Sequence, residues 1–282
     1  MTSGYPPWGL HETDSYPLTV RRRATRGYGW LRDHPDHRDQ IYARGSWDVG
    51  DHIDLEGQCP HVYDQGPLGS CTGNAIAAAI QFVRMKHKLR GAEENVPSRL
   101  FIYFGERVIA GSVDSDTGGS MRDGIKVAVA DGTCFEDGPN AWPYEVARFA
   151  DRPPKACFTA AKKGEVKSYN RIQQNISDME ACLAEGFPFV FGFTAFAALE
   201  SKAVKKRGAL PLPKADDQPV GGHAVMAVGY NRSQRQFKVR NSWGKDWGQA
   251  GYFWMPYDYL SNPNLASDFW TIRLMESVKS VK

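Results

Sequence analysis

The spacing of apolar residues divides the chain after residue 50 into a helix-rich half and a strand-rich half. An alanine-rich apolar run over 75–83 follows a glycine- and proline-rich turn, which predicts a buried helix beginning near Cys71. Apolar residues at helical spacing predict a second helix over about 98–110, with Ser98 as its N-cap. A third helix is predicted over 121–130. The first half is therefore expected to be mainly helical.

The second half combines one short helix with several strands. Ser-Asp-Met-Glu at 177–180 matches a capping box, and Gly186 ends the helix that this box opens. Strands are predicted over 187–193, where Gly192 marks the end, and over 223–230, 236–241 and 251–255, with a polar loop over 203–219. This order predicts an α+β fold of two lobes, a helical lobe over about 60–165 and a β lobe over about 166–275.

The composition is that of an ordinary water-soluble globular protein. Of the 282 residues, 41% are hydrophobic and 24% charged, and the net charge of +3 is too small to indicate a nucleic-acid or membrane-surface partner. No apolar run reaches the roughly 18 residues that a membrane span needs. Residues 1–30 contain no secretory signal, so a cytoplasmic location is favoured, with export by another route left open.

The five cysteines form no CxxC pair and no cluster with metal-ligand spacing, so neither a metal nor another cofactor is expected. If Cys71 is set aside, Cys59, Cys134, Cys157 and Cys182 allow two disulfides. Buried free thiols are the more common state for a chain without a secretory signal.

Cys71 is the residue with the clearest chemical role to offer. A thiol in the first turn of a helix faces unpaired backbone N–H groups and the positive end of the helix dipole, which favour the nucleophilic thiolate. A cysteine nucleophile also needs a base and a group that orients the base. His223 and Asn241 flank a predicted hairpin centred on residue 232, so a symmetric hairpin would set them opposite each other.

Each of these three residues has an ordinary structural explanation when it is considered alone. A single cysteine is most often a small buried hydrophobe, and a histidine at the start of an apolar strand is more often structural. The three residues become a candidate catalytic set because they occur together at a helix start, a strand start and a strand end.

Four short blocks then follow one another along the chain. The first is Gln65-Gly66 with Gly69-Ser70-Cys71, the second is Gly118-Gly119, the third is His223-Ala-Val-Met-Ala-Val-Gly-Tyr230, and the fourth is Asn241-Ser-Trp-Gly244 followed by Trp247-Gly248 and Gly251-Tyr252. Together they resemble the nucleophile, substrate-binding, histidine and asparagine blocks of the papain family of cysteine peptidases. The resemblance spans about residues 51–275.

The resemblance implies a papain-like two-lobe fold, with the active cleft between the helical lobe and a β-barrel-like lobe. It also implies hydrolysis of peptide bonds through a thioester. In that scheme Cys71 and His223 form a thiolate–imidazolium pair, Asn241 orients His223, and Trp243 shields their contact from water. The side chain of Gln65 and the backbone N–H of Cys71 hold the oxyanion.

The same resemblance suggests residues that bind substrate. Gly118 and Gly119 would let an extended peptide approach the backbone closely. Ser267 or Asp268 would line a side-chain pocket, where Asp268 would favour a basic side chain, although an exposed surface carboxylate is the ordinary explanation for such a residue.

Three features depart from the usual pattern of the family. Thr72 stands where an aromatic residue commonly follows the cysteine, and Leu68 stands where a half-cystine is often found. Fifty residues of this composition do not accommodate the family's long helical propeptide. The chain therefore resembles a bacterial or viral branch with a short N-terminal segment.

Residues 1–50 differ in character from the peptidase domain expected over 51–282. They contain many glycines, prolines, histidines and charges, with Arg21, Arg22, Arg23 and Arg26 clustered, and their apolar periodicity is weak. Such a stretch is either a surface tail or a propeptide-like segment that lies in or near the cleft and inhibits the enzyme.

Two other functions would use the same residues. One is a catalytically silent papain-like binding protein, and the other is an acyl transferase or ligase. The intact set of Cys71, His223, Asn241 and Gln65 favours an active peptidase, which we expect to be a monomer acting on peptide or protein substrates.

Overall fold

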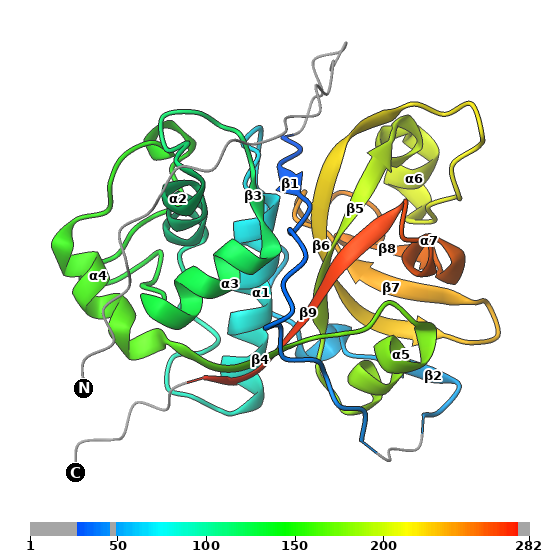
Figure 1. Ribbon diagram of the computed structural model, residues 1–282, viewed down its shortest axis with the longest axis horizontal. Helices are drawn as coiled ribbons and strands as arrows, with labels where there is room; N and C mark the ends of the chain where they lie inside the picture. Colours follow the sequence, from blue (N-terminus) through cyan, green and yellow to red (C-terminus); the bar gives the residue numbers. More distant parts are fainter. Residues whose placement is uncertain (1–26, 46–48, 276–282) are drawn as a thin grey trace.

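The computed structural model describes residues 27–45 and 49–275, which form two lobes (Figure 1). One lobe is built around the central helix α1 (Cys71–Lys86), with α2 (Arg99–Ala110), α3 (Met121–Ala130) and α4 (Lys155–Ala161) beside it. The other lobe is built on a sheet and carries α5 (Ile176–Ala184), α6 (Lys202–Arg207) and α7 (Tyr257–Ser261). This is the α+β two-lobe arrangement that the sequence predicts.

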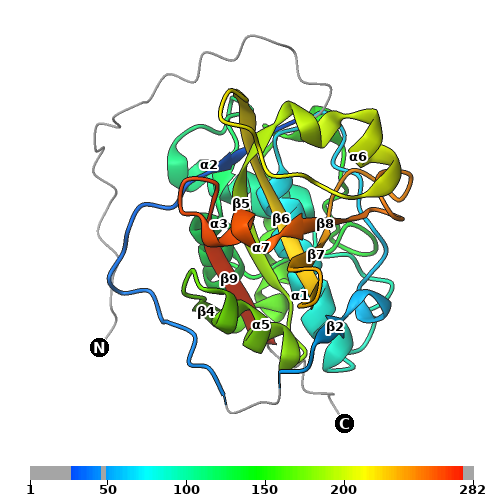
Figure 2. The same cartoon turned by 90° about the vertical axis from the view of Figure 1, so that its right-hand side faces the viewer.

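Seven strands form the sheet of the second lobe, and all of their pairings are antiparallel. Their order is β4 (Val166–Arg171), β9 (Ala266–Met275), β5 (Phe189–Phe196), β6 (Pro219–Asn231), β7 (Gln236–Arg240) and β8 (Tyr252–Pro256), with β2 (His52–Asp54) paired to β6. Figure 2 shows α6 and α7 on the side of this sheet away from the helical lobe. Short 3₁₀ helices cover Glu56–Gln58, Val146–Arg148, Lys162–Gly164 and Ala197–Glu200.

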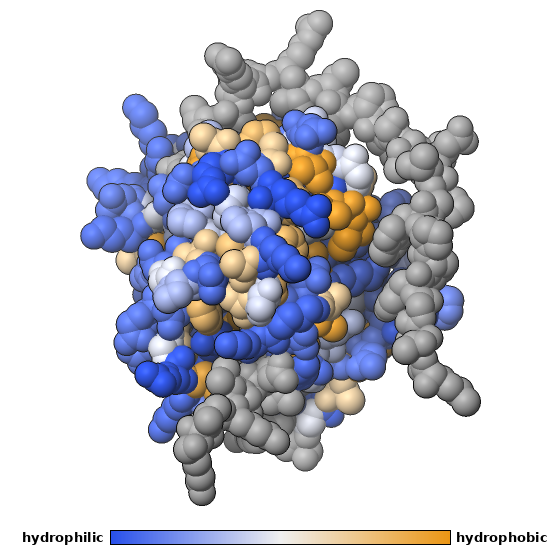
Figure 3. Space-filling model, turned by 90° about the vertical axis from the view of Figure 1, so that its left-hand side faces the viewer, coloured by the Kyte–Doolittle hydropathy of each residue, from blue (hydrophilic) through white to orange (hydrophobic). Residues whose placement is uncertain are grey.

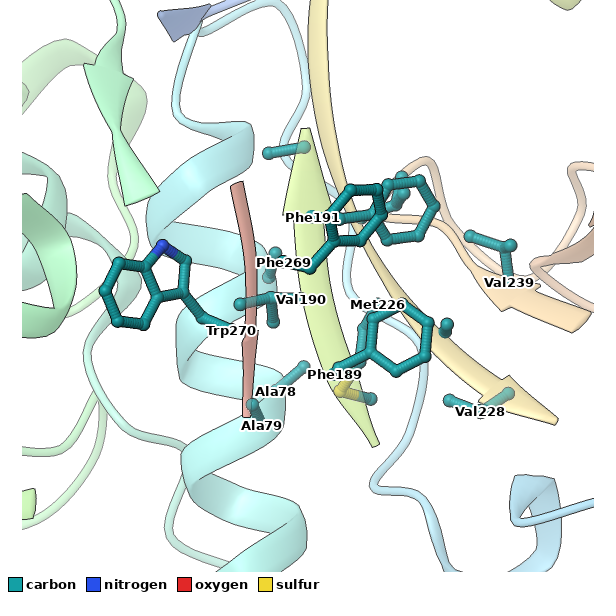
Figure 4. Packing of buried hydrophobic residues seen from close by; sticks show 14 of the residues in the cluster. Ala78, Ala79, Phe189, Val190, Phe191, Met226, Val228, Val239, Phe269 and Trp270 are labelled. Carbon is teal, nitrogen blue, oxygen red and sulfur yellow. The ribbon is translucent and has the colours of Figure 1, made fainter. Parts of the chain in front are cut away.

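The core explains why β5 is apolar along almost its whole length. Its side chains alternate between two buried environments, as expected for a strand covered on both faces. Val190 lies toward α1, together with Trp270 of β9, whereas Phe189 and Phe191 lie on the opposite side with Phe269 (Figure 4). The alanines of α1 let this helix pack closely against the sheet, which places the start of the helix between the lobes.

The predicted helices of the first half are confirmed, and several details of the second half are corrected. Ser98 caps α2 by accepting a hydrogen bond from Phe101, as predicted. The capping residue of α5 is Asn175 rather than Ser177. Gly192 lies inside β5 instead of ending it, and the predicted loop over 203–219 contains most of α6.

Before β2, the chain runs along the boundary between the two lobes (dark blue in Figure 1). We call residues 27–39 the covering segment. Its short strand β1 (Trp30–Leu31) pairs in parallel with β3 (Gly119–Ser120) of the helical lobe. The arginine cluster at 21–26 lies outside the described residues, and the division of the chain at about residues 50 and 165 stays a prediction.

The face of the helical lobe is mainly hydrophilic, with hydrophobic residues gathered near one edge (Figure 3). Within residues 27–45 and 49–275, no helix is long and apolar enough to cross a bilayer. All five cysteines are unbridged, and four of them are buried.

Candidate active site

Cys71 is the first residue of α1 and is fully buried. Three backbone N–H groups lie close enough to its sulfur to lower the pKa of the thiol, from Ala224 of β6, from Gly29 of the covering segment and from Thr72. The thiol is therefore surrounded by donors from a strand, a helix start and the N-terminal part of the chain. Because Ala224 follows His223, the same contact brings the histidine strand to the nucleophile.

His223 and Asn241 are in direct contact. Nε2 of His223 lies 2.8 Å from Oδ1 of Asn241, and both side chains are buried. Nδ1 of His223 is buried and has no hydrogen-bond partner among the residues described. The indole of Trp243 lies over the imidazole, with 4.9 Å between the ring centroids. One ring nitrogen is thus fixed by an amide oxygen, while the other is left for a further partner.

The predicted symmetric register of this hairpin is wrong. The last pair of the β6–β7 ladder is Met226 with Arg240. The next residue, Asn241, therefore lies nearest to Val225 on the facing strand and not directly opposite His223. The register shifts at Val228, which is the extra residue of a β-bulge between Ala227 and Gly229. The contact between the two side chains survives because it is diagonal, a distance that a long side chain can span.

The pKa values of this covered site favour neutral groups. Burial raises the pKa of Cys71 to about 12, although the three N–H groups act in the opposite direction. Burial lowers the pKa of His223 to about 4, and the hydrogen bond that the imidazole donates to Asn241 Oδ1 offsets only part of this change. With the site covered, the thiol and the imidazole are both uncharged at neutral pH.

Gln65 lies in the loop before α1 with its side chain fully buried. Its Nε2 donates hydrogen bonds of 2.9 Å to the carbonyl of Gly27 and to the carbonyl of Leu68. Ser242 fixes the amide by donating to its Oε1 at 2.6 Å. The donor expected to hold an oxyanion is therefore aimed at a carbonyl of the covering segment.

The backbone of the covering segment lies directly against the glycines of the helical lobe. Gly119 donates its N–H to the carbonyl of Gly29 at 2.8 Å. A Cβ on Gly29 would lie 1.7 Å from the carbonyl oxygen of Gly69, and a Cβ on Gly118, whose φ is +85°, would lie 2.1 Å from the carbonyl oxygen of Gly29. Backbone approaches this close are possible only for glycine. The glycine pair predicted to bind a peptide thus binds this part of the chain itself.

Two aromatic side chains of the covering segment fill the space on the β-lobe side. Tyr28 packs edge-on against His223 and Trp243, with centroid distances of 5.9 and 6.0 Å. Trp30 is buried where Gly192 and Gly222 leave room for its indole. The position of Gly192 inside β5 has this contact as its reason, since a Cβ there would lie 1.8 Å from the indole ring.

Asp268 is buried beneath the covering segment rather than exposed at the surface. Its Oδ2 accepts hydrogen bonds from the indole N–H of Trp30 at 3.2 Å and from the backbone N–H of Asp33 at 2.8 Å. Its Oδ1 lies 3.2 Å from the guanidinium of Arg171. The neighbouring residue Ser267 is paired with Gly192 in the β5–β9 ladder. Asp268 therefore contacts a buried side chain, as a pocket residue would, but this side chain is Trp30 of the covering segment.

Charged groups anchor the covering segment further along. The carboxylate of Asp33 accepts from the backbone N–H of Arg122 at 3.0 Å and from the indole N–H of Trp270 at 2.9 Å. Asp39 bridges the guanidinium groups of Arg122 and Arg171, at 2.6 and 3.0 Å. Sequence reasoning missed these anchors because they join residues that are far apart in the chain.

Sequence reasoning also missed a buried carboxyl next to the nucleophile. Glu106 of α2 is fully buried, and the hydroxyl of Thr72 donates to its Oε2 at 2.6 Å. A glutamate within the apolar stripe of a predicted helix was the available signal. In the part of the chain that the structure describes, no group of three or more His, Cys, Asp or Glu side chains could hold a metal ion.

Comparison with known proteins identifies the family of this chain. The sequence profile described as "Papain family cysteine protease" matches residues 49–269. The chain belongs to the papain family of cysteine proteases. It is a hydrolase of that family, and neither a silent binding protein nor a ligase is favoured by these similarities.

Relatives of this papain-family protease occur in a virus and in a bacterium. An uncharacterized peptidase C1-like protein of Acanthamoeba polyphaga mimivirus is 38% identical over 277 residues, which cover 88% of this chain and 87% of the viral protein. The crystal structure of xylellain, a cysteine protease from Xylella fastidiosa, is 42% identical with a TM-score of 0.80 and covers 90% of this chain and 98% of xylellain.

A more distant structure shares the fold of the protease. Procathepsin L 3 from the larval midgut of Tenebrio molitor has a TM-score of 0.66 at 18% identity, and the match covers 89% of this chain and 76% of the procathepsin. The papain-like fold that the sequence predicts is thus confirmed by relatives at very different degrees of identity.

Proposed function

We propose that this papain-family protease hydrolyses peptide bonds with Cys71 as nucleophile, His223 as base and acid, and Asn241 as the group that orients His223. The observation that carries the proposal is the state of the imidazole. Its Nε2 lies 2.8 Å from the amide oxygen of Asn241, and its Nδ1 has no hydrogen-bond partner within residues 27–45 and 49–275. A base held at one nitrogen and available at the other is what nucleophilic catalysis by a thiol needs.

In the proposed reaction His223 takes the proton of Cys71, and the thiolate attacks the carbonyl carbon of the peptide. The imidazolium then gives its proton to the leaving amine, so that a thioester and a free amine result. A water molecule loses its proton to His223 and attacks the thioester, which releases the acid and regenerates the thiol. The neutral amide of Asn241 suffices as the orienting group because the charge lies on the thiolate–imidazolium pair.

We assign the oxyanion donors to the Gln65 side chain and the backbone N–H of Cys71. The assignment is supported by the hydrogen bond from Gln65 Nε2 to the carbonyl of Gly27 and by the fixation of the Gln65 amide through Ser242. A donor that is held in place before the reaction needs no reorganisation when negative charge develops on the substrate oxygen.

We further propose that the covering segment inhibits the enzyme. It buries Cys71 and His223 completely and occupies the N–H of Gly119, which a peptide substrate would use. In the covered state both reacting groups are neutral, because burial raises the pKa of the thiol and lowers that of the imidazole. Displacement of the covering segment would readmit water and favour the ionised pair.

The test is a peptide-library cleavage profile of the full chain and of its Trp30→Ala variant, which is expected to be uncovered. We expect Cys71→Ala to abolish hydrolysis in both backgrounds. Cys59→Ala is the matched control, because it removes a half-buried thiol that is not part of the proposed catalytic set, and it should retain activity. Hydrolysis that persists in Cys71→Ala would refute the assignment of the nucleophile.

A further inference from the structure

Glu106 lies between the nucleophile helix and the strand that pairs with the covering segment. Its Oε2 accepts the hydroxyl hydrogen of Thr72, the residue directly after Cys71, at 2.6 Å. Its Oε1 is buried and has no hydrogen-bond partner in the described part of the chain. A carboxyl group that is fully buried and half unpartnered is costly to keep, so a reason for its position is needed.

Two glycines make room for this carboxyl. A Cβ on Gly119 of β3 would lie 2.2 Å from Oε2, and a Cβ on Gly124 of α3 would lie 2.3 Å from Oε1. The carboxyl of Glu106 therefore fills the space that two absent side chains leave. It contacts the backbone of the same glycine whose N–H binds the covering segment, and it contacts α1 through Thr72.

Among the residues that the structure describes, no cation forms an ion pair with the carboxyl of Glu106. The nearby Arg107 guanidinium donates instead to the carbonyls of Tyr103 and Val113. Burial raises the pKa of Glu106 well above its usual value, and the charges of Asp123 on α3 and Asp33 on the covering segment act in the same direction. The Thr72 hydroxyl and the Arg107 charge lower the pKa of Glu106 but do not outweigh burial.

The charge of Glu106 also matters to the nucleophile. A negative charge on this residue raises the pKa of Cys71, because it opposes formation of a second negative charge nearby. A neutral carboxyl avoids this penalty and can still accept the hydrogen bond from Thr72.

We propose that Glu106 is a positioning residue of the peptidase, kept as a neutral carboxyl that fixes the start of α1 against the peptide-binding backbone at Gly119. The proposal rests on the function proposed above. Glu106 touches neither substrate nor the reacting atoms, and it acts through Thr72 on Cys71 and through β3 on the bound peptide. It also gives a reason for Thr72, since an aromatic side chain at that position could not donate this hydrogen bond in the same way.

Three variants in the full chain separate this role from simple core packing. Glu106→Gln keeps the shape and the accepting oxygen but cannot ionise. Glu106→Ala removes the group, and Thr72→Val removes the donor while keeping the size of the side chain. Each is combined with Trp30→Ala so that the site is open. The readouts are kcat and KM on a peptide found in the library profile, and the rate of Cys71 alkylation by iodoacetamide as a function of pH.

We expect Glu106→Gln to keep kcat/KM within about threefold of the parent value. Glu106→Ala and Thr72→Val should lower kcat by roughly 10- to 100-fold, because a reacting group misplaced by about an ångström has an effect of this size. Above the pKa of Glu106, alkylation of the parent chain should slow relative to that of Glu106→Gln. The infrared difference spectrum between the full chain and Glu106→Gln should contain the carbonyl band of a protonated carboxylic acid.

A carboxylate band in that spectrum at neutral pH would overturn the proposal. So would a Glu106→Gln variant as impaired as Glu106→Ala, or a Thr72→Val variant with the parent's kcat. If Glu106→Ala does not fold, the comparison of Glu106→Gln with Thr72→Val still decides the matter. If no form hydrolyses peptides, the proposed function fails, whereas the infrared and alkylation results still test the position and charge of Glu106.

Discussion

Replacing Trp30 by alanine should uncover the active site of the full chain. The indole is 7% exposed, lies against Gly192 and Gly222, and donates its N–H to Asp268. All of these contacts are lost when the covering segment leaves, so they stabilise only the covered state. The substitution removes them from that state and leaves the open state unaffected, which shifts the population toward the open enzyme.

The size of the shift follows from the burial of Trp30. Truncation of a buried tryptophan to alanine costs about 3–5 kcal/mol, and the lower end is appropriate for a side chain at the boundary between lobes. A loss of about 3 kcal/mol changes the equilibrium between covered and open forms by roughly 100-fold. While the open form remains the minor one, the reactivity of Cys71 rises by the same factor.

The assay is alkylation of the full chain by iodoacetamide at neutral pH, followed by digestion and mass spectrometry of the peptide that contains Cys71. Cys59 is half-buried and serves as an internal reference for the reagent. Leu31→Ala is the matched control, because Leu31 belongs to the same strand β1 but its side chain is 44% exposed. We expect this control to react within about twofold of the parent chain.

Two results would refute this reasoning. If Trp30→Ala is folded and its Cys71 reacts at the parent rate, the indole does not hold the covering segment in place. If Leu31→Ala accelerates alkylation as strongly as Trp30→Ala, the effect reports general loosening of the segment and not the loss of one buried contact.

Three further predictions use the same full-length chain. Gly192→Ala should raise the rate of Cys71 alkylation, because its Cβ would lie 1.8 Å from the indole of Trp30. The double variant Trp30→Ala/Gly192→Ala should react little faster than Trp30→Ala alone. Full additivity would show that the two substitutions act independently. Gln65→Ala in the Trp30→Ala background should lower kcat by about 10²–10³-fold, whereas the rate of Cys71 alkylation should change far less because alkylation forms no oxyanion. An unchanged kcat would contradict the assignment of Gln65 as an oxyanion donor. Burial, with the nearby charge of Asp33, raises the pKa of Asp268 to about 6 in the covered state, so the covered state is stabilised at low pH and loses this stabilisation as pH rises through about 6. The rate of Cys71 alkylation should therefore rise more steeply with pH in the parent chain than in Asp268→Asn. Equal slopes in the two proteins would exclude this linkage.

Local sequence signals were sufficient for the start of α1, whereas the triad that they suggested stays a proposal. Glycine, proline and serine before an alanine-rich run define the beginning of a helix almost independently of tertiary structure. The N-cap of α5 was misassigned because Asn175 and Ser177 are both good capping residues, and the sequence alone does not say which one adopts the required backbone conformation. The hairpin register failed because a β-bulge at Val228 leaves no sequence mark.

Residues whose role depends on distant partners could not be recognised from the sequence. Gly192 has the ordinary signature of a strand end, and only the presence of Trp30 explains why it lies within β5. Asp268 could be proposed as a pocket residue by resemblance, but its contact with the covering segment joins residues more than two hundred positions apart. Glu106 was hidden for the same reason, because its space is created by glycines of two other elements.

The covering segment is part of the same chain as the site that it covers, and this connection has a kinetic consequence. A tethered ligand is present at an effective concentration on the order of millimolar, whatever the concentration of the protein. Dilution therefore cannot release it, and a micromolar peptide substrate competes with it poorly. Latency should be equal in a crowded and in a dilute solution, and activation should follow first-order kinetics set by opening or cleavage of the chain.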